Sequence, residues 1–222
     1  MNSLKLGTIK HICFDLDGTL VDSKKTILES TKAALDNLSI KHNIPEESFH
    51  NMIGKHFVDI FIKLEMDDVD FEEFIPIYKS LYFDFIDYSY LYGEVRETLD
   101  YLKGKKIRIS LLTTKVQEQA EKIIEHFKLK SYFDYIMGRR EGLAHKPSSE
   151  PLLYICKELK VDPSETLMVG DTELDIQCGK KAGAKTCGVL YGYRTREQIE
   201  KEKPDLVVKT LKESKILPFV LQ

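Results

Sequence analysis

The stretch Ile12–Leu20, ICFDLDGTL, places an apolar run directly before two aspartates, Asp15 and Asp17, which are separated by a single residue. A Gly-Thr pair follows at once. An apolar run of this length is typical of a buried strand. In an open parallel sheet, functional groups collect where the strands end. The stretch therefore predicts a buried strand that delivers two carboxylates to such an edge, and the rest of the chain must explain how their repulsion is tolerated.

The bulk composition favours a globular protein without a charged binding face. The chain has 222 residues, of which 42% are hydrophobic and 31% charged, with a net charge of −3. That length suits one domain, or a core with a smaller inserted domain. The near-neutral balance argues against nucleic-acid or membrane partners. No run of about 18 apolar residues occurs, so we expect a soluble, cytoplasmic protein that is a monomer or a homodimer.

Several short apolar runs repeat along the chain with helical stretches between them. Six of them read as strands: 8–15, 106–113, 133–138, 165–171, 184–190 and 204–208. Nearly continuous apolar strands that alternate with helices indicate an α/β fold, with a parallel sheet covered on both faces. The intervening stretches 114–129 and 149–159 have helical periodicity, with Val116 and Leu153 among the residues expected to face the core.

The spacing changes between the first two strands. About 90 residues separate them, far more than one crossover helix requires. Apolar residues at helical spacing occur throughout this segment, and an aromatic stripe from Phe71 to Phe85 is read as core packing. We therefore expect a helical insert over residues 23–90, with a catalytic core formed by residues 1–22 and 91–222.

Reactive side chains follow four of the predicted strands or lie in the loops after them. They are Asp15 and Asp17, then Thr113 and Thr114 with Lys115 behind them, then Lys146, and last Asp171 and Asp175. Taken singly, each has an ordinary structural explanation, such as a helix cap or a solvated loop residue. Brought together, several carboxylates would repel one another unless a hard cation such as Mg²⁺ bound them. The lysine and a threonine would then hold a second anion, most simply a phosphoryl group.

Four motifs in this order resemble those of the haloacid dehalogenase superfamily. They are FDLDGTL at Phe14–Leu20, LLTTK at Leu111–Lys115, KP at Lys146–Pro147 and VGDTELD at Val169–Asp175, and GVLYGY at Gly188–Tyr193 is also similar. The closest likeness is to the phosphoglycolate-phosphatase-like branch, in which a helical cap follows the first motif. The resemblance implies a doubly wound, Rossmann-like core and a Mg²⁺-dependent transfer of phosphate through an aspartyl-phosphate. The implied substrate is a small phosphorylated metabolite, such as phosphoglycolate, a sugar phosphate, a nucleotide or pyrophosphate.

The resemblance also implies a role for each matching residue. Asp15 is expected to be the nucleophile and a Mg²⁺ ligand. Asp17 is expected to act as general acid and then base, with its backbone carbonyl on the metal. Thr113 and Lys146 would hold phosphoryl oxygens, and Asp171 would complete the metal ligands.

Further residues are expected around these. Asp175 would support the metal ligands without binding the metal itself, or it would orient Lys146. Gly18, Thr19 and Thr114 are expected to contact the substrate, although many relatives carry Asn at the position of Thr114. In the insert, Lys55 and His56 are expected to contact an anionic or polar leaving group.

Other functions fit parts of the pattern. A phosphomutase of the β-phosphoglucomutase type would keep the site and change the acceptor of the phosphoryl group. A phosphorylated receiver protein also combines Asp, Thr and Lys at strand ends, but its phosphoacceptor follows the third strand and it has no helical insert. A non-catalytic phosphate-binding protein is a further alternative. Asp17 argues against a dehalogenase, which lacks the second aspartate of the first motif.

Overall fold

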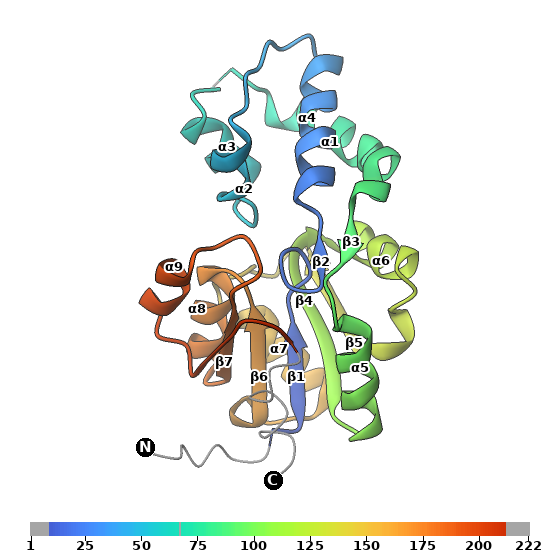
Figure 1. Ribbon diagram of the computed structural model, residues 1–222, viewed down its shortest axis with the longest axis vertical. Coiled ribbons are helices and arrows are strands. Elements are labelled where there is room, and N and C mark those ends of the chain that lie inside the picture. Colours follow the sequence, from blue (N-terminus) through green and yellow to red (C-terminus); the bar gives the residue numbers. More distant parts are fainter. Residues whose placement is uncertain (1–8, 67, 212–222) are drawn as a thin grey trace. The chain divides into compact units, whose positions relative to one another are not determined.

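The core is a six-stranded parallel sheet with the first strand at its centre. The computed structural model describes residues 9–66 and 68–211. The strands of the sheet are β1 (His11–Phe14), β4 (Arg108–Val116), β5 (Tyr135–Arg139), β6 (Thr166–Gly170), β7 (Lys185–Val189) and β8 (Leu206–Val208). They lie in the order β5-β4-β1-β6-β7-β8, with β1 hydrogen-bonded to both β4 and β6 (Figure 1). This is the doubly wound, Rossmann-like order, so the predicted fold class is confirmed.

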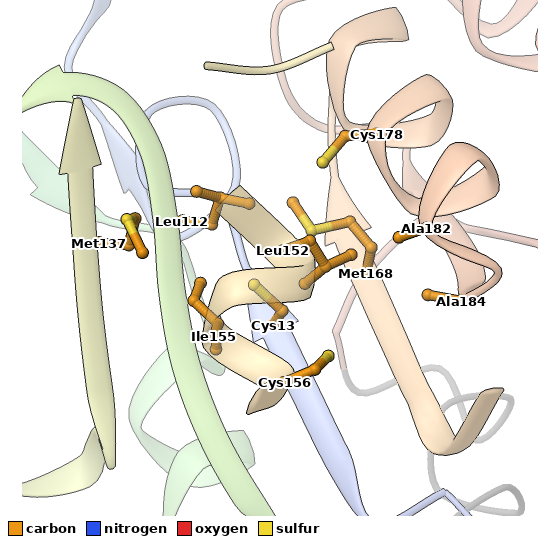
Figure 2. Packing of buried hydrophobic residues seen from close by; sticks show 10 residues of the cluster. All are labelled: Cys13, Leu112, Met137, Leu152, Ile155, Cys156, Met168, Cys178, Ala182 and Ala184. Atoms are coloured by element: carbon orange, nitrogen blue, oxygen red, sulfur yellow. The ribbon is translucent and has the colours of Figure 1, made fainter. Parts of the chain in front are cut away.

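Helices flank the sheet. The core helices are α5 (Val95–Gly104), α6 (Gln117–His126), α7 (Glu150–Leu159), α8 (Glu173–Ala182) and α9 (Arg196–Lys201), with single 3₁₀ turns at Lys130–Tyr132 and Pro163–Glu165. Figure 2 shows Leu152 and Ile155 of α7 packed with Cys13 of β1 and Met168 of β6. Helices α7 and α8 thus cover one face, and because parallel crossovers are right-handed, α5 and α6 cover the other.

A second compact unit runs over Val21–Tyr90, between the two parts of the core. It contains α1 (Lys24–Asn37), α2 (Glu46–His50), α3 (Phe57–Lys63), α4 (Phe71–Leu81) and a 3₁₀ segment at Tyr82–Tyr88. Two short strands, β2 (Val21–Asp22) and β3 (Tyr90–Leu91), form a separate two-stranded sheet. The unit starts two residues before the predicted start at 23, and its function as a cap stays a prediction.

Aromatic rings fill the interior of this unit. Phe57, Phe61, Phe74 and Tyr78 pack against one another, with ring centroids 4.7 to 5.8 Å apart. The aromatic stripe is therefore core packing, as predicted. Among the described residues of the whole chain, no helix is both long and apolar enough to span a bilayer. The ends of the predicted core, residues 1–8 and 212–222, lie outside the described residues.

Two local predictions were wrong. Strand β4 continues to Val116, so this residue ends a strand and does not start a helical face. The strand extends because its pairing with β5 shifts register between Leu112 and Val116. Leu153 of α7 is 40% exposed, because the buried stripe of that helix consists of Pro151, Leu152, Ile155 and Cys156.

A polar network lies in the sheet near the start of the strands. His11 on β1 is fully buried, and its two ring nitrogens lie 3.1 Å from Thr166 Oγ1 and 2.8 Å from Ser110 Oγ. Burial lowers the pKa of His11 to about 4, with a smaller opposing effect from Asp134. The ring is therefore neutral near pH 7 and both of its nitrogens have partners.

Candidate active site

The first motif leaves β1 through a turn that requires glycine. Asp15 follows the strand directly, and its N–H continues the sheet by donating to the Val169 carbonyl at 2.9 Å. Gly18 has φ = +81°, and a Cβ there would lie 2.2 Å from Asp171 Oδ2. Any side chain at position 18 would therefore strain the backbone and also collide with that carboxylate. The glycine brings the first motif close to the end of β6.

Asp171 is buried, and its carboxylate accepts hydrogen bonds from two neutral donors. The Thr19 hydroxyl donates to Oδ1 at 3.0 Å, and the Tyr193 N–H donates to Oδ2 at 2.8 Å. A Cβ at Gly192 would lie 2.3 Å from the Cβ of Asp171, so the loop after β7 closes tightly over this side chain. Burial, followed by the charge of Asp175, raises the pKa of Asp171 to about 7.

Lys146 joins two of the carboxylates. Its Nζ lies 2.8 Å from Asp15 Oδ1 and 2.6 Å from Asp175 Oδ1, and the residue is only 2% exposed. Asp175 is held in turn by the backbone N–H and the hydroxyl of Thr172, which donate to Oδ2 at 3.0 and 2.7 Å. Burial opposes the charge on the lysine, yet Asp15 and Asp175 together raise its pKa. The lysine therefore remains an ammonium ion.

The Asp15 carboxyl lies under two opposing influences. Burial and the charge of Asp175 raise its pKa well above the usual range, while Lys146 acts in the other direction. Among the described residues, Asp15, Asp171 and Asp175 have oxygens within 4.8 Å of one another. The ammonium of Lys146 contacts only two of these three acids.

This donor set suits a hard divalent cation. It consists of carboxylate oxygens, which are the ligands that such cations prefer. Asp175 is already neutralised by Lys146, whereas no lysine or arginine of residues 9–66 and 68–211 lies within ion-pair distance of Asp171. A cation would thus be most needed between Asp15 and Asp171.

The second motif lies on β4, the strand next to β1. Thr113 is buried in β4, three residues before the strand ends at Val116, and its Oγ1 accepts the Lys115 N–H at 3.2 Å. Thr114 is half-buried. The Nζ of Lys115 lies 3.4 Å from Asp17 Oδ2, so this lysine connects the second motif with the first.

The structure thus brings Asp15, Lys146, Asp171 and Asp175 into one cluster. The hydroxyl of Thr19, a predicted substrate ligand, donates to Asp171, so its visible role is to orient that carboxylate. Substrate contacts of Gly18, Thr19, Thr113 and Thr114 stay predictions.

The two residues proposed in the insert belong to the other compact unit. Lys55 is exposed, and His56 caps α3, where its Nδ1 accepts the Val58 N–H at 3.4 Å. The His56 ring also packs on Phe71, with centroids 4.7 Å apart. Their contact with a leaving group stays a prediction.

Two contributors had no role assigned from the sequence. The Tyr193 N–H holds Asp171, but a backbone donor leaves no side-chain signature, and only the GVLYGY run marked its loop. Lys115 was visible as the residue after the two threonines, but its partner Asp17 lies 98 positions away in the chain.

Comparisons with known proteins place the chain in a family. A model of the haloacid dehalogenase-like hydrolases matches residues 12–189. The chain therefore belongs to this family, and the predicted family is confirmed.

Two similar proteins are named as phosphatases. A phosphoglycolate phosphatase of Aquifex aeolicus is 34% identical, over 83% of this chain and 86% of that protein. The pyrophosphatase PpaX of Bacillus mycoides is 33% identical, over 96% of this chain and 97% of that protein. A crystal structure of a predicted phosphoglycolate phosphatase from Haemophilus somnus superposes with a TM-score of 0.82 at 27% identity, covering 96% of this chain and 99% of that one. The prediction of a hydrolase of the phosphatase class is confirmed.

Proposed function

We propose that this protein is a Mg²⁺-dependent phosphatase that hydrolyses a small phosphorylated metabolite through an aspartyl-phosphate on Asp15. The observation that carries the proposal is the position of Lys146. Its ammonium contacts Asp15 and Asp175 at 2.8 and 2.6 Å, in a cluster where a third carboxylate, Asp171, has no ion-pair partner among the described residues. Such a site is favourable only when additional positive charge and an anionic substrate share it.

The first half of the reaction uses Asp15 and Asp17. A carboxylate oxygen of Asp15 attacks phosphorus, and the bond between phosphorus and the leaving-group oxygen breaks. Asp17 donates a proton to that oxygen, so the leaving group departs as a neutral hydroxyl. Lys146 and Thr113 stabilise the charge that develops on the phosphoryl oxygens.

The second half regenerates the enzyme. Asp17, now deprotonated, takes a proton from a water molecule, which attacks phosphorus as hydroxide. The bond from phosphorus to Asp15 breaks and inorganic phosphate is released. Because Asp17 alternates between acid and base, the site completes a turnover without a second protein acid.

Asp15, Asp171 and the Asp17 backbone carbonyl would hold the metal. When bound, Mg²⁺ would neutralise the buried carboxylates and withdraw electron density from the phosphoryl group. Thr19 and the Tyr193 N–H keep the Asp171 carboxylate oriented for this purpose. Lys146 pairs with Asp175 and so neutralises that carboxylate without a metal.

The test is hydrolysis of p-nitrophenyl phosphate by the full chain. We expect phosphate release in plain water, reversible loss with EDTA, and a loss of at least about a thousandfold in kcat for Asp15→Asn. Release of inorganic phosphate also separates a phosphatase from a phosphomutase.

Asp59→Asn is a matched control, because Asp59 is an exposed acid in α3. Its rate should equal that of the wild type. Asp15→Asn activity within tenfold of the wild type would refute the assignment of the nucleophile.

A further inference from the structure

Lys115 is a second lysine at the same edge of the sheet, with a different environment from Lys146. Its Nζ lies 3.4 Å from Asp17 Oδ2, and the two side chains are 9% and 12% exposed. Lys146 is more deeply buried and bridges two carboxylates, those of Asp15 and Asp175. Lys115 instead faces the one acid that the proposed reaction brings against the leaving group.

The backbone around Lys115 is held in a defined position. Its N–H donates to Thr113 Oγ1 at 3.2 Å, where β4 shifts register against β5. Gly138 on β5 makes this shift sterically feasible, because a Cβ there would lie 2.9 Å from the Lys115 carbonyl oxygen and 2.5 Å from Gln117 Cα. The Gln117 side chain also accepts the Gly138 N–H at 2.7 Å. Hydrogen bonds and close packing therefore define the backbone position from which the lysine side chain extends.

We propose that Lys115 is a specificity-determining residue that binds a second anion, a carboxylate or a phosphate, carried by the leaving group of the substrate. This proposal rests on the proposed function, because it places the leaving group at Asp17. It deepens that function by naming the substrate class as phosphorylated compounds with an anionic leaving group.

The geometry at Asp17 supports the proposal. A general acid must come within about 2.6–3.2 Å of the oxygen that it protonates. Lys115 Nζ is 3.4 Å from the Asp17 carboxylate. It therefore lies within about two hydrogen-bond lengths of the leaving-group oxygen that Asp17 protonates. An anion attached one or two bonds beyond that oxygen falls within reach of the ammonium.

The phosphatases similar to this chain fit this class. Phosphoglycolate carries a carboxylate on its leaving group, and the leaving group of pyrophosphate is itself a phosphate. The two compounds share only the transferred phosphoryl group and a second anion close to it. A single lysine beside the general acid accommodates both, whereas a pocket shaped for one of them would not.

The test compares Lys115→Met with wild type on three substrates. Phosphoglycolate and pyrophosphate present a carboxylate and a phosphate, and 2-hydroxyethyl phosphate is a neutral counterpart of similar length. We expect wild type to prefer one or both anionic substrates. Lys115→Met should lower kcat/KM on all three, but at least about tenfold more on the preferred anionic substrate. Lys115→Arg should retain most of the preference.

Lys122→Met is the matched control, because Lys122 is an exposed lysine of the following helix, paired with Glu118. It should change neither rate nor preference. Equal losses on all three substrates would show that Lys115 acts only through Asp17 and would overturn the proposal. So would a wild-type enzyme that hydrolyses the neutral ester as well as the anionic ones. A wild-type protein that hydrolyses no phosphate compound would instead refute the proposed function itself.

Discussion

Two buried polar clusters lie at opposite ends of strands β1 and β6 and differ in how their members are satisfied. The first surrounds His11, with Ser110 and Thr166 on the neighbouring strands. The second lies beyond the other end of β1 and contains Asp15, Lys146 and Asp171. Each contains fully or nearly fully buried polar residues from several segments of the chain. The two clusters are therefore similarly buried, but the first is neutral and the second is acidic.

The difference between the two clusters separates structure from function. His11 is neutral, its pKa is lowered to about 4, and both ring nitrogens have hydroxyl partners. In the acidic cluster, burial raises the pKa of Asp15 and also that of Asp171, to about 7. Buried polar groups that satisfy one another stabilise a fold. Buried charged groups that do not satisfy one another are stabilised only by a ligand that binds to them. Such a cluster therefore indicates a functional site.

The largest expected effect comes from removing the cation of the acidic cluster. Lys146→Met leaves Asp15 and Asp175 facing each other without a counter-charge. We expect kcat/KM to fall by at least about a thousandfold, and the free energy of unfolding in EDTA to fall by about 3–5 kcal/mol. Phosphate release and urea denaturation measure the two effects.

Lys181→Met is the control for that variant. Lys181 is exposed on α8 and donates to the Pro147 carbonyl at 3.1 Å, next to Lys146, without contacting a site carboxylate. Its substitution should leave activity within a factor of two. If Lys146→Met retained activity within tenfold of wild type, the acidic cluster would not be the catalytic centre.

Much of this arrangement could be predicted, because its signals are local in the sequence. All six strands of the core sheet were expected, since each is a short apolar run between helical stretches. The ends of parallel strands meet at one edge, so the clustering of Asp15 with Asp171 and Lys146 followed from the same pattern.

The remainder depends on contacts between distant positions. No sequence pattern singled out His11, because its partners Ser110 and Thr166 lie 99 and 155 positions away. The extension of β4 to Val116 depends on the absence of a side chain at Gly138 on the next strand. Neither contact is indicated by the residues that lie next to it in the sequence.

The His11 cluster should make stability depend on pH. The unfolded imidazole takes up a proton near pH 6.5, whereas folded His11 does so only near pH 4. As the pH falls between these values, the unfolded state binds more protons, so His11 should lower the free energy of unfolding by up to about 3 kcal/mol. Above pH 6.5 this contribution should be absent.

The measurement compares wild type with His11→Asn by urea denaturation in EDTA between pH 7.5 and about pH 4. The site carboxylates are present in both proteins, so the difference in unfolding free energy isolates His11. As the pH falls, we expect the free energy of unfolding to decrease more for wild type than for His11→Asn. His126→Asn, which replaces an exposed histidine, should run parallel to wild type. Should the variant fail to fold, the His11 ring resonance of wild type must still show no protonation at pH 5.5.

The smallest expected effect comes from changing the shape of the acidic cluster and not its charge. Gly18→Ala would place a methyl group 2.2 Å from Asp171 Oδ2, so this carboxylate must move. A displacement of about 1 Å should lower kcat/KM by up to about a hundredfold and raise the Mg²⁺ concentration needed for half-maximal activity. Gly142→Ala is matched for backbone strain, because Gly142 has φ = +72° but no atom within 4 Å of the added Cβ. Backbone strain should cost each variant about 1–2 kcal/mol of stability, and the collision with Asp171 adds to this loss in Gly18→Ala. Equal activities in the two variants would show that the position of Asp171 does not control the reaction.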